Sequence, residues 1–446
     1  MDRAKAPTRA AVIVPVLPRA LRSDEESSQN RPRLTRSADA RHEEAVGLAQ
    51  AIDLDIVYSA VVVVNDPRPA TLLGSGKVEE IAGIVKEDKV EVVIFDHPLT
   101  PVQQRNLEKG LNAKVLDRTA LILEIFGERA RTKEGALQVE LAHLNYQKGR
   151  LVRSWTHLER QRGGGGFLGG PGETQIEADR RVLQDKIIKL KRELETVRRT
   201  RDLHRAKRKK VPFPVVAIVG YTNAGKSTLF NRLTGAGVLA EDMLFATLDP
   251  TLRRVRLPHG TPIILSDTVG FISDLPTHLV AAFRATLEEV VEADLVLHLR
   301  DIADPDTAAQ AEDVERILGD LGVDASDRKR VIEVWNKIDL LDEGNRARLL
   351  GEGTADRLEP PVAISAATGE GLDALTAIIE QRVSGDLKEV TVALRPHQLG
   401  LVDWLYRNGD VVSREDNEDG SVSMTIRATE TAREEIQSRL RPKNSA

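Results

Sequence analysis

Residues 220–228, with the sequence GYTNAGKST, have the residue types and spacing best suited to chemistry. In the pattern G-x-x-x-x-G-K-S, glycines let backbone N–H groups turn toward phosphate oxygens, and the helix N-terminus that follows adds positive potential. Lys226 would reach the β- and γ-phosphates, and the hydroxyl of Ser227 would bind Mg²⁺. The pattern predicts a nucleoside triphosphate site made by Gly220, Tyr221, Thr222, Asn223, Ala224, Gly225, Lys226, Ser227 and Thr228.

The flanking residues support this interpretation. Residues 215–219 form a continuous apolar run, typical of a strand that is buried on both faces. Leu229 and Leu233 then repeat with helical spacing. A glycine-rich turn can be purely structural, but the complete pattern between a strand and a helix favours phosphate binding.

A second motif follows about forty residues later, where the apolar run 263–265 leads into Asp267, Thr268, Val269 and Gly270. A carboxylate at the end of a strand can hold Mg²⁺, and the N–H of Gly270 can meet the γ-phosphate. A D-x-x-G motif alone is common. Its place after a phosphate loop makes it a predicted part of the same site.

Two further segments predict the base. Asn336, Lys337 and Asp339 follow an apolar run, and the carboxylate of Asp339 can accept hydrogen bonds from the N1–H and exocyclic amine of guanine. A site built to pair such donors rejects bases that lack them. Lys337 would lie along the base, and Ser365 with Ala366 would place a backbone N–H near the guanine oxygen. An isolated N-K-x-D is often a solvated turn, but four motifs in this order predict GTP.

These motifs together resemble those of translation-factor-class GTPases, and residues 245–251, FATLDPT, resemble the first switch of the HflX family. The resemblance implies that Phe245, Ala246 and Thr247 belong to the nucleotide site, and that Thr247 closes over Mg²⁺ and the γ-phosphate. It implies a catalytic set of Lys226, Thr247 and Gly270, with Ser227, Thr247 and Asp267 as Mg²⁺ ligands.

Phe271 stands where many relatives of Ras carry a glutamine that orients the attacking water. Because a phenyl ring cannot orient water by hydrogen bonding, we expect slow intrinsic hydrolysis until a partner completes the site.

The composition limits the class of protein. The chain has 446 residues, 41% hydrophobic and 30% charged, a formal net charge of −5 and no cysteine. Disulfides and cysteine metal sites are excluded, and no apolar run approaches the roughly 20 residues that span a bilayer. The apolar residues 11–17 include a proline and are better explained as a strand than as a signal core. We expect a cytoplasmic monomer without stable membrane insertion, and peripheral attachment to a membrane stays open.

The order of apolar patterns predicts an α/β multidomain protein. We expect an N-terminal doubly wound α/β domain with a long antiparallel helical hairpin, a P-loop GTPase domain and a small α+β C-terminal domain. The expected ranges are 1–38 for a basic tail and insertion with a possible first strand, 39–130 for the α/β domain, 131–210 for the hairpin, 211–385 for the GTPase domain and 386–446 for the C-terminal domain.

Residues 74–77, GSGK, leave a second nucleotide site open. A turn from a strand to a helix with this sequence could bind the phosphates of ATP, but no complete Walker pattern surrounds it. A structural or RNA-contacting turn is the alternative.

The expected hairpin has two apolar stripes. Leu137, Leu141 and Leu144 begin the first stripe with heptad spacing, and Lys148 is its one polar position. The second stripe contains Ile187, Leu190 and Leu194. Antiparallel packing explains both stripes, so we expect the function to lie at the tip and along the outer face.

The tip, residues 162–174, is rich in glycine, and the GPGETQ segment at residues 170–175 resembles an HflX signature. HflX proteins commonly carry arginine at the position of Gly169 and glycine at that of Phe167, so one tip charge is missing here. A plain flexible linker is the alternative.

Residues 198–210 hold eight basic residues against one acid, a density that favours contact with a polyanion over a merely solvated face. No aromatic ladder accompanies them, so we expect contacts to the phosphate backbone of a folded RNA. The predicted RNA-binding residues are Arg160, Arg162, Arg198, Arg199, Arg201, Arg205, Lys207, Arg208, Lys209 and Lys210.

The HflX resemblance covers most of residues 40–385 and implies a GTPase that binds the large ribosomal subunit and its rRNA and helps to split or rescue stalled ribosomes. Two alternatives stay open. One is an RNA-remodelling ATPase that uses residues 74–77, and the other is a scaffold that holds GDP without catalysis.

Overall fold

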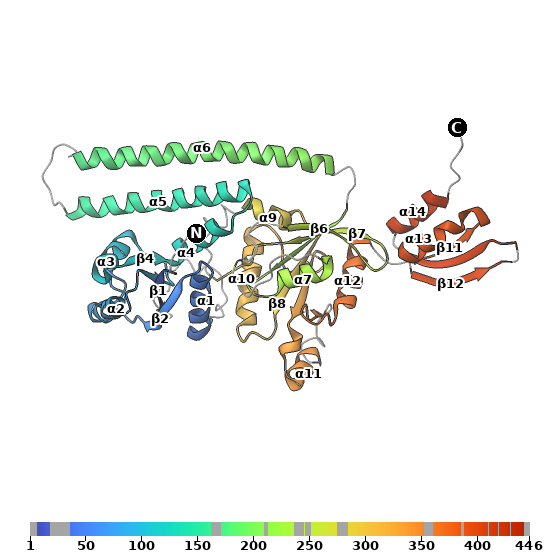
Figure 1. Cartoon of the computed structure of the whole chain (residues 1–446), viewed down its shortest axis with the longest axis horizontal. Helices are drawn as coiled ribbons and strands as arrows, with labels where there is room; N and C mark the ends of the chain where they lie inside the picture. The colour runs from blue at the N-terminus through green and yellow to red at the C-terminus, as the bar shows by residue number, and fades with distance from the viewer. Residues whose placement is uncertain are drawn as a thin grey trace, which may run out of the picture.

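The protein folds around three β-sheets in the order of the chain (Figure 1). The computed structural model describes residues 7–17, 36–161, 171–208, 213–235, 245, 251–273, 284–351, 360–384, 388–408, 410–417, 419–428 and 430–440, and at several helix ends only the backbone. Within these residues, no helix is both long enough and apolar enough to cross a membrane.

The first sheet is parallel and four-stranded, with the strand order β2-β1-β3-β4. Its strands are β1 (Arg9–Val16), β2 (Asp55–Val63), β3 (Val92–Phe95) and β4 (Lys114–Asp117). Its helices are α1 (Ala38–Gln50), α2 (Ser75–Glu87), α3 (Pro101–Leu111) and α4 (Arg118–Arg129). We call this part the N-terminal unit.

Helices cover both faces of that sheet, as the sequence predicts. Val12 and Val14 of β1 pack with the buried residues of α1 and α4, whereas Ala11 and Ile13 pack with those of α2 and α3. Successive residues of a strand point to opposite faces, so a strand with two covered faces must be apolar throughout. The doubly wound arrangement is confirmed.

Two long antiparallel helices form the predicted hairpin, α5 (Lys133–Gln161) and α6 (Pro171–Arg208). Leu137 and Leu144 pack with Ile187, Leu190 and Leu194 between the helices. Lys148, the polar position of the stripe, donates to Gln184 Oε1 across the hairpin at 2.5 Å. Residues 171–174, which we expected in the glycine-rich tip, form the first turn of α6, since proline is favoured in the first turn of a helix.

A six-stranded sheet forms the GTPase unit, with the order β10-β9-β8-β5-β7-β6 and only β6 antiparallel. Its strands are β5 (Val215–Gly220), β6 (Thr251–Arg256), β7 (Pro262–Asp267), β8 (Leu295–Asp301), β9 (Val331–Asn336) and β10 (Val362–Ala363). Its helical segments are α7 (Lys226–Thr234), α9 (Arg284–Val291), α10 (Thr307–Asp320), η3 (Ile338–Leu340), α11 (Glu343–Gly351) and α12 (Leu372–Ser384).

The C-terminal unit is an antiparallel sheet in the order β11-β13-β12 with helices beside it, and it stands apart beyond α12 (Figure 1). Its elements are β11 (Lys388–Leu394), η4 (Pro396–Leu401), α13 (Val402–Asn408), β12 (Asp410–Asp416), β13 (Val422–Ala428) and α14 (Glu430–Leu440). It has its own apolar core around Leu394, Met424 and Ile426, as an α+β domain requires.

Candidate active site

The predicted phosphate loop joins the C-terminal end of β5 to the first turn of α7. Gly225 has φ +90°, and a Cβ atom there would lie 2.3 Å from Asn336 Nδ2, so only glycine fits. Thr222 is 7% exposed, and its hydroxyl has no hydrogen-bond partner among the described residues. A buried polar group without a partner inside a phosphate loop is suited to a bound oxyanion or water.

Lys226 is the first residue of α7, and its buried side chain reaches back along the loop, where the ammonium group donates to the carbonyl of Tyr221 at 2.6 Å. Burial lowers the pKa of Lys226 to about 8, and the nearby Lys337 charge adds to this, while Asp267 opposes it. A bound phosphate would favour the charged form, because an anion at this site replaces the lost hydration.

Ser227 and Asp267 meet at the loop, where the serine hydroxyl donates to Asp267 Oδ2 at 2.8 Å. A hydroxyl and a carboxylate are hard oxygen donors of the kind that Mg²⁺ prefers, and a magnesium site usually takes few protein ligands together with substrate phosphates. Both residues therefore fit the predicted metal site. Thr247, its third predicted ligand, and Ala246 lie outside the described residues.

The segment that follows Asp267 is paired with the phosphate loop. Thr222 N–H donates to the carbonyl of Phe271 at 2.7 Å, and Phe271 N–H donates to the carbonyl of Gly220 at 3.1 Å. Between them, a Cβ atom on Gly270 would lie 3.0 Å from Lys226 Nζ. The two groups expected at the γ-phosphate, Gly270 and Lys226, are thus adjacent.

Asn336 ties the expected guanine segments to the phosphate loop. Its Nδ2 donates to the carbonyl of Ala224 at 2.8 Å, and its Oδ1 accepts from Ala366 N–H at 2.9 Å. Asp339 is exposed in η3, where its carboxylate is accessible to a base. Lys337 is held by Asp301 Oδ2 at 2.8 Å, a partner that the sequence reasoning missed although Asp301 ends an apolar strand.

A buried polar cluster joins the N-terminal unit to the phosphate loop, and sequence reasoning missed it. The hydroxyl of Tyr221 donates to Glu44 of α1, and it accepts from Ser273 N–H at 2.7 Å and from Arg36 Nη1 at 2.8 Å. Arg118 of α4 also donates a hydrogen bond to Glu44. The available signals were a charged Glu44 within the buried stripe of α1, and an Asp–Arg pair at the start of α4.

Phe245, at the start of the expected first switch, also contacts the N-terminal unit. Its ring packs edge-on against Phe126 of α4, with the centroids 4.8 Å apart and the planes at 79°. Phe245 is 3% exposed and has φ +58°, which is uncommon for a bulky side chain. Its predicted place in the nucleotide site stays a prediction, while its packing against α4 is an added feature.

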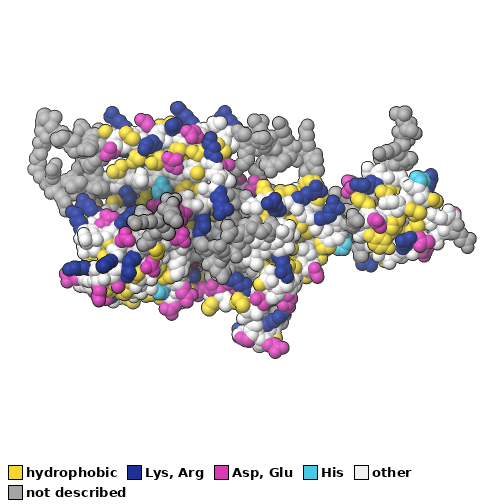
Figure 2. All heavy atoms as spheres, viewed as in Figure 1, with side chains coloured by type: hydrophobic (Ala, Val, Ile, Leu, Met, Phe, Trp, Pro, Cys, Tyr) yellow, Lys and Arg dark blue, Asp and Glu magenta, His cyan; other side chains and the backbone are white. Residues whose placement is uncertain are grey.

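The predicted RNA-binding residues fall mostly outside the described side chains. The backbone of α6 continues to Arg208, so six of the basic residues lie in its last turns; Arg199 is exposed and pairs with Glu195 at 3.2 Å. Arg162, Lys209, Lys210 and the expected tip around Phe167 and Gly169 lie outside the description. Lys and Arg side chains project along the edge that α6 forms, with acidic side chains between them (Figure 2).

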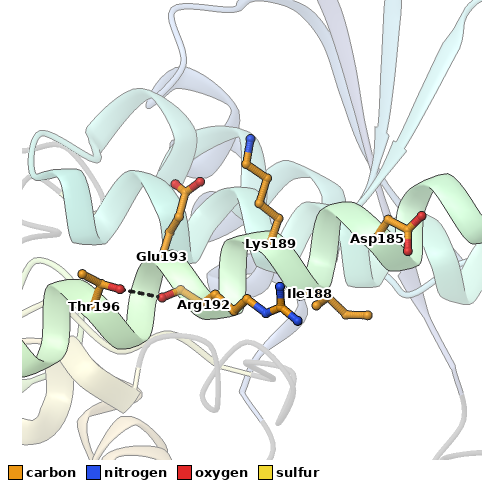
Figure 3. Close-up of a pocket in the computed structure, with 6 residues that line it drawn as sticks. All are labelled: Asp185, Ile188, Lys189, Arg192, Glu193 and Thr196. Carbon is orange, nitrogen blue, oxygen red and sulfur yellow. Dashed lines mark hydrogen bonds between the residues drawn. The ribbon is translucent and has the colours of Figure 1, made fainter.

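Two other places do not resemble a nucleotide site. In residues 74–77, Gly74 precedes α2 but no strand leads into it, since β2 ends at Val63, and Lys77 pairs with Glu80 at 2.7 Å. The expected turn from a strand to a helix is wrong there. The described residues that line a pocket beside α6 all belong to that helix, with acidic and basic side chains mixed around Ile188 (Figure 3).

The fold and the order of these motifs define a P-loop GTPase, and family models match along the chain. They are GTP-binding GTPase N-terminal at residues 39–127, GTP-binding GTPase Middle Region at 129–208, 50S ribosome-binding GTPase at 215–337 and HflX C-terminal domain at 353–445.

Curated relatives agree with the family models. The chain is 53% identical to GTPase HflX of Magnetococcus marinus, over 81% of this chain and 82% of that one, and 47% identical to GTPase HflX of Escherichia coli, over 81% and 83%. A GTP-binding protein of Sulfolobus solfataricus in complex with GDP matches at 24% identity and a TM-score of 0.42, over 84% and 98%. The chain belongs to the HflX family of GTP-hydrolysing enzymes.

Proposed function

We propose that this protein is a GTP-driven switch that binds the large ribosomal subunit through its rRNA and promotes splitting or rescue of stalled ribosomes in the cytoplasm. The match of residues 215–337 to the 50S ribosome-binding GTPase model carries the proposal. The basic end of α6, directly before the phosphate loop, supports it, because phosphate-backbone contacts supply most of the affinity for RNA.

In the proposed reaction, water attacks the γ-phosphorus of GTP, the bond to the β-γ bridging oxygen breaks, and GDP and inorganic phosphate form. Lys226 and the Gly270 N–H would stabilise charge on the γ-phosphate, and Asp339 and the Ala366 N–H would hold guanine. Ser227, Asp267 and Thr247 would hold Mg²⁺, which neutralises charge on the β- and γ-phosphate oxygens.

Release of the γ-phosphate would free Thr247 and Gly270, so that the affinity for RNA falls after hydrolysis. Phe271 is 1% exposed and offers no hydrogen bond to a water molecule. We therefore infer that the ribosome supplies or orders the group that positions the attacking water.

The test is GTP hydrolysis with and without purified large subunits at two salt concentrations. We expect strong stimulation that weakens at high salt, because each phosphate contact releases counterions. Replacing Arg205, Lys207 and Arg208 by alanine should remove most of the stimulation by large subunits. Replacing the exposed Arg427 and Arg439 of the C-terminal unit by alanine should leave the stimulation unchanged. If large subunits do not stimulate GTP hydrolysis, the proposal that the ribosome is the activating partner is wrong.

A further inference from the structure

Glu44 is a buried carboxylate of the N-terminal unit that contacts the GTPase unit with both oxygens. It is 8% exposed, and Oε1 accepts from Arg118 Nη2 at 2.5 Å and from the hydroxyl of Ser273 at 3.0 Å. Oε2 accepts from Arg36 and from the hydroxyl of Tyr221. All the ordinary acceptor directions of the carboxylate are used, and two of its four donors belong to the GTPase unit.

Ser273 is held as completely as Glu44. Its N–H donates to Tyr221 at 2.7 Å, and its carbonyl accepts from Arg118 Nη2 at 2.8 Å. Ser273 lies three residues after Gly270, in the segment that pairs with the phosphate loop through Phe271. The N-terminal unit therefore forms hydrogen bonds both with the beginning of the phosphate loop and with the segment that carries Gly270.

Among the described residues, this cluster holds as many carboxylates as guanidinium groups. Although burial opposes it, the Arg118 and Arg36 charges lower the pKa of Glu44 to about 2, so the carboxylate stays ionised at neutral pH. The carboxylates are Glu44, Asp96 and Asp306, and the guanidinium groups are Arg36, Arg41 and Arg118. Removing one partner of a buried ion pair leaves an uncompensated charge, so the contact between the units is expected to form or break as a whole.

The same corner of the N-terminal unit holds the hairpin. Asp117, next to Arg118, accepts from Arg150 Nη2 at 2.5 Å and from the hydroxyl of Tyr146 at 2.7 Å, both on α5. The Arg150 guanidinium also lies 4.4 Å from the ring centroid of Tyr146. Adjacent residues at the start of α4 therefore fix the hairpin on one side and Ser273 on the other.

We propose that Glu44 and Arg118 are positioning residues, which hold Tyr221 and Ser273 so that the Gly270 N–H stays beside Lys226, ready for a γ-phosphate. Binding free energies are reciprocal: if the docked N-terminal unit favours γ-phosphate binding, then a γ-phosphate must tighten the docking of the N-terminal unit and its hairpin. This proposal concerns a single chain and its nucleotide, so it stands whether or not the ribosome is the partner.

The experiment compares the full chain with Glu44→Gln, Tyr221→Phe and the double variant, using fluorescent GDP and a non-hydrolysable GTP analogue. We expect the affinity for the GTP analogue to fall roughly 5- to 50-fold while GDP affinity stays within about twofold, because the proposed contact of the Gly270 N–H is to the γ-phosphate, which GDP lacks. The effects of the two single substitutions should not add in the double variant, because each of them removes the same contact between Glu44 and Tyr221. Glu80→Gln, which removes the exposed pair with Lys77, is the matched control and should change neither affinity.

Hydrogen exchange gives a second readout. The GTP analogue should slow exchange in α1 and around Ser273 relative to GDP, and Glu44→Gln should abolish that difference. Equal losses for both nucleotides, or exchange that ignores the nucleotide, would show a purely structural contact and overturn the proposal. If Glu44→Gln fails to fold, Tyr221→Phe, which removes a single hydroxyl, decides the matter with the same measurements.

Discussion

Among the described residues, the side chain of Asn336 joins the phosphate loop to the expected guanine segments through hydrogen bonds of its own. It is 1% exposed, donates to Ala224 and accepts from Ala366. The same side chain lies against Gly225, where a Cβ atom has no room. The asparagine of the N-K-x-D motif in this protein thus connects the phosphate loop at Ala224 to the loop at Ala366.

We predict that Asn336→Ala weakens GDP binding by about 10- to 100-fold, because it removes two buried hydrogen bonds, to the Ala224 carbonyl and from the Ala366 N–H, each worth about 0.5–1.5 kcal/mol net. Titration with a fluorescent GDP analogue checks this. Asn345→Ala, at an exposed turn where the side chain pairs with Asp342, is the control and should bind as the parent does. Unchanged affinity in Asn336→Ala would contradict the assigned role.

Lys226 gives a prediction about pH. Its pKa of about 8 in the nucleotide-free protein is below the ordinary lysine value, so the ammonium is progressively lost above pH 8. Bound phosphate favours the charged form, so GDP affinity should fall by up to about tenfold per pH unit above pH 8. A titration series from pH 7 to about pH 10 measures this. Lys226→Arg stays charged throughout, so it reports any contribution from the base and should show a flatter profile.

At the scale of elements, the hairpin is held together by an apolar stripe between α5 and α6. Leu190 of α6 is 6% exposed within the α5–α6 core, whereas Ile188, two positions earlier, is 39% exposed. We predict that Leu190→Ala destabilises the hairpin by about 2–4 kcal/mol, and Ile188→Ala by less than about 1 kcal/mol. Hydrogen exchange of the α5 and α6 amides checks this locally; equal effects would contradict the assigned packing.

At the scale of the whole molecule, the N-terminal unit contacts the hairpin through Asp117 and the GTPase unit through Glu44, and Arg150 is one of the hairpin residues that bind Asp117. Arg150→Met keeps the apolar stem but loses the pair with Asp117. We predict basal GTP hydrolysis within about twofold of the parent and stimulation by large subunits reduced roughly tenfold, since the coupling of the two sites is worth about 1–3 kcal/mol. Arg105→Met, at an exposed site on α3, should leave both rates unchanged. Full stimulation of Arg150→Met would show that the anchor is dispensable.

The sequence by itself predicted many of the elements and the motifs of the candidate site. Continuous apolar runs place β1 and the strands that end in Gly220, Asp267 and Asn336, and apolar residues with helical spacing place the two stripes of the hairpin. These signals are local, because the buried faces of a strand or helix determine which of its consecutive residues are apolar. The phosphate-loop pattern and N-K-x-D are likewise local, since a loop that surrounds a phosphate or a base supplies its groups from a few neighbouring positions.

Only the tertiary structure decided how these parts are joined. Nothing in the local pattern brings Glu44 to Tyr221, 177 residues away along the chain, or Arg118 to Ser273. Local pattern also cannot show that Asn336 is bound to Ala224, or that Phe126 meets Phe245. The charges of a buried ion pair come from segments that are distant in the sequence and are brought together only by the fold. Because each buried charge has lost its hydration, it is stable only when its partner is also present. The motifs of the candidate site could therefore be recognised in the sequence, whereas the contact between the N-terminal unit and the phosphate loop could not.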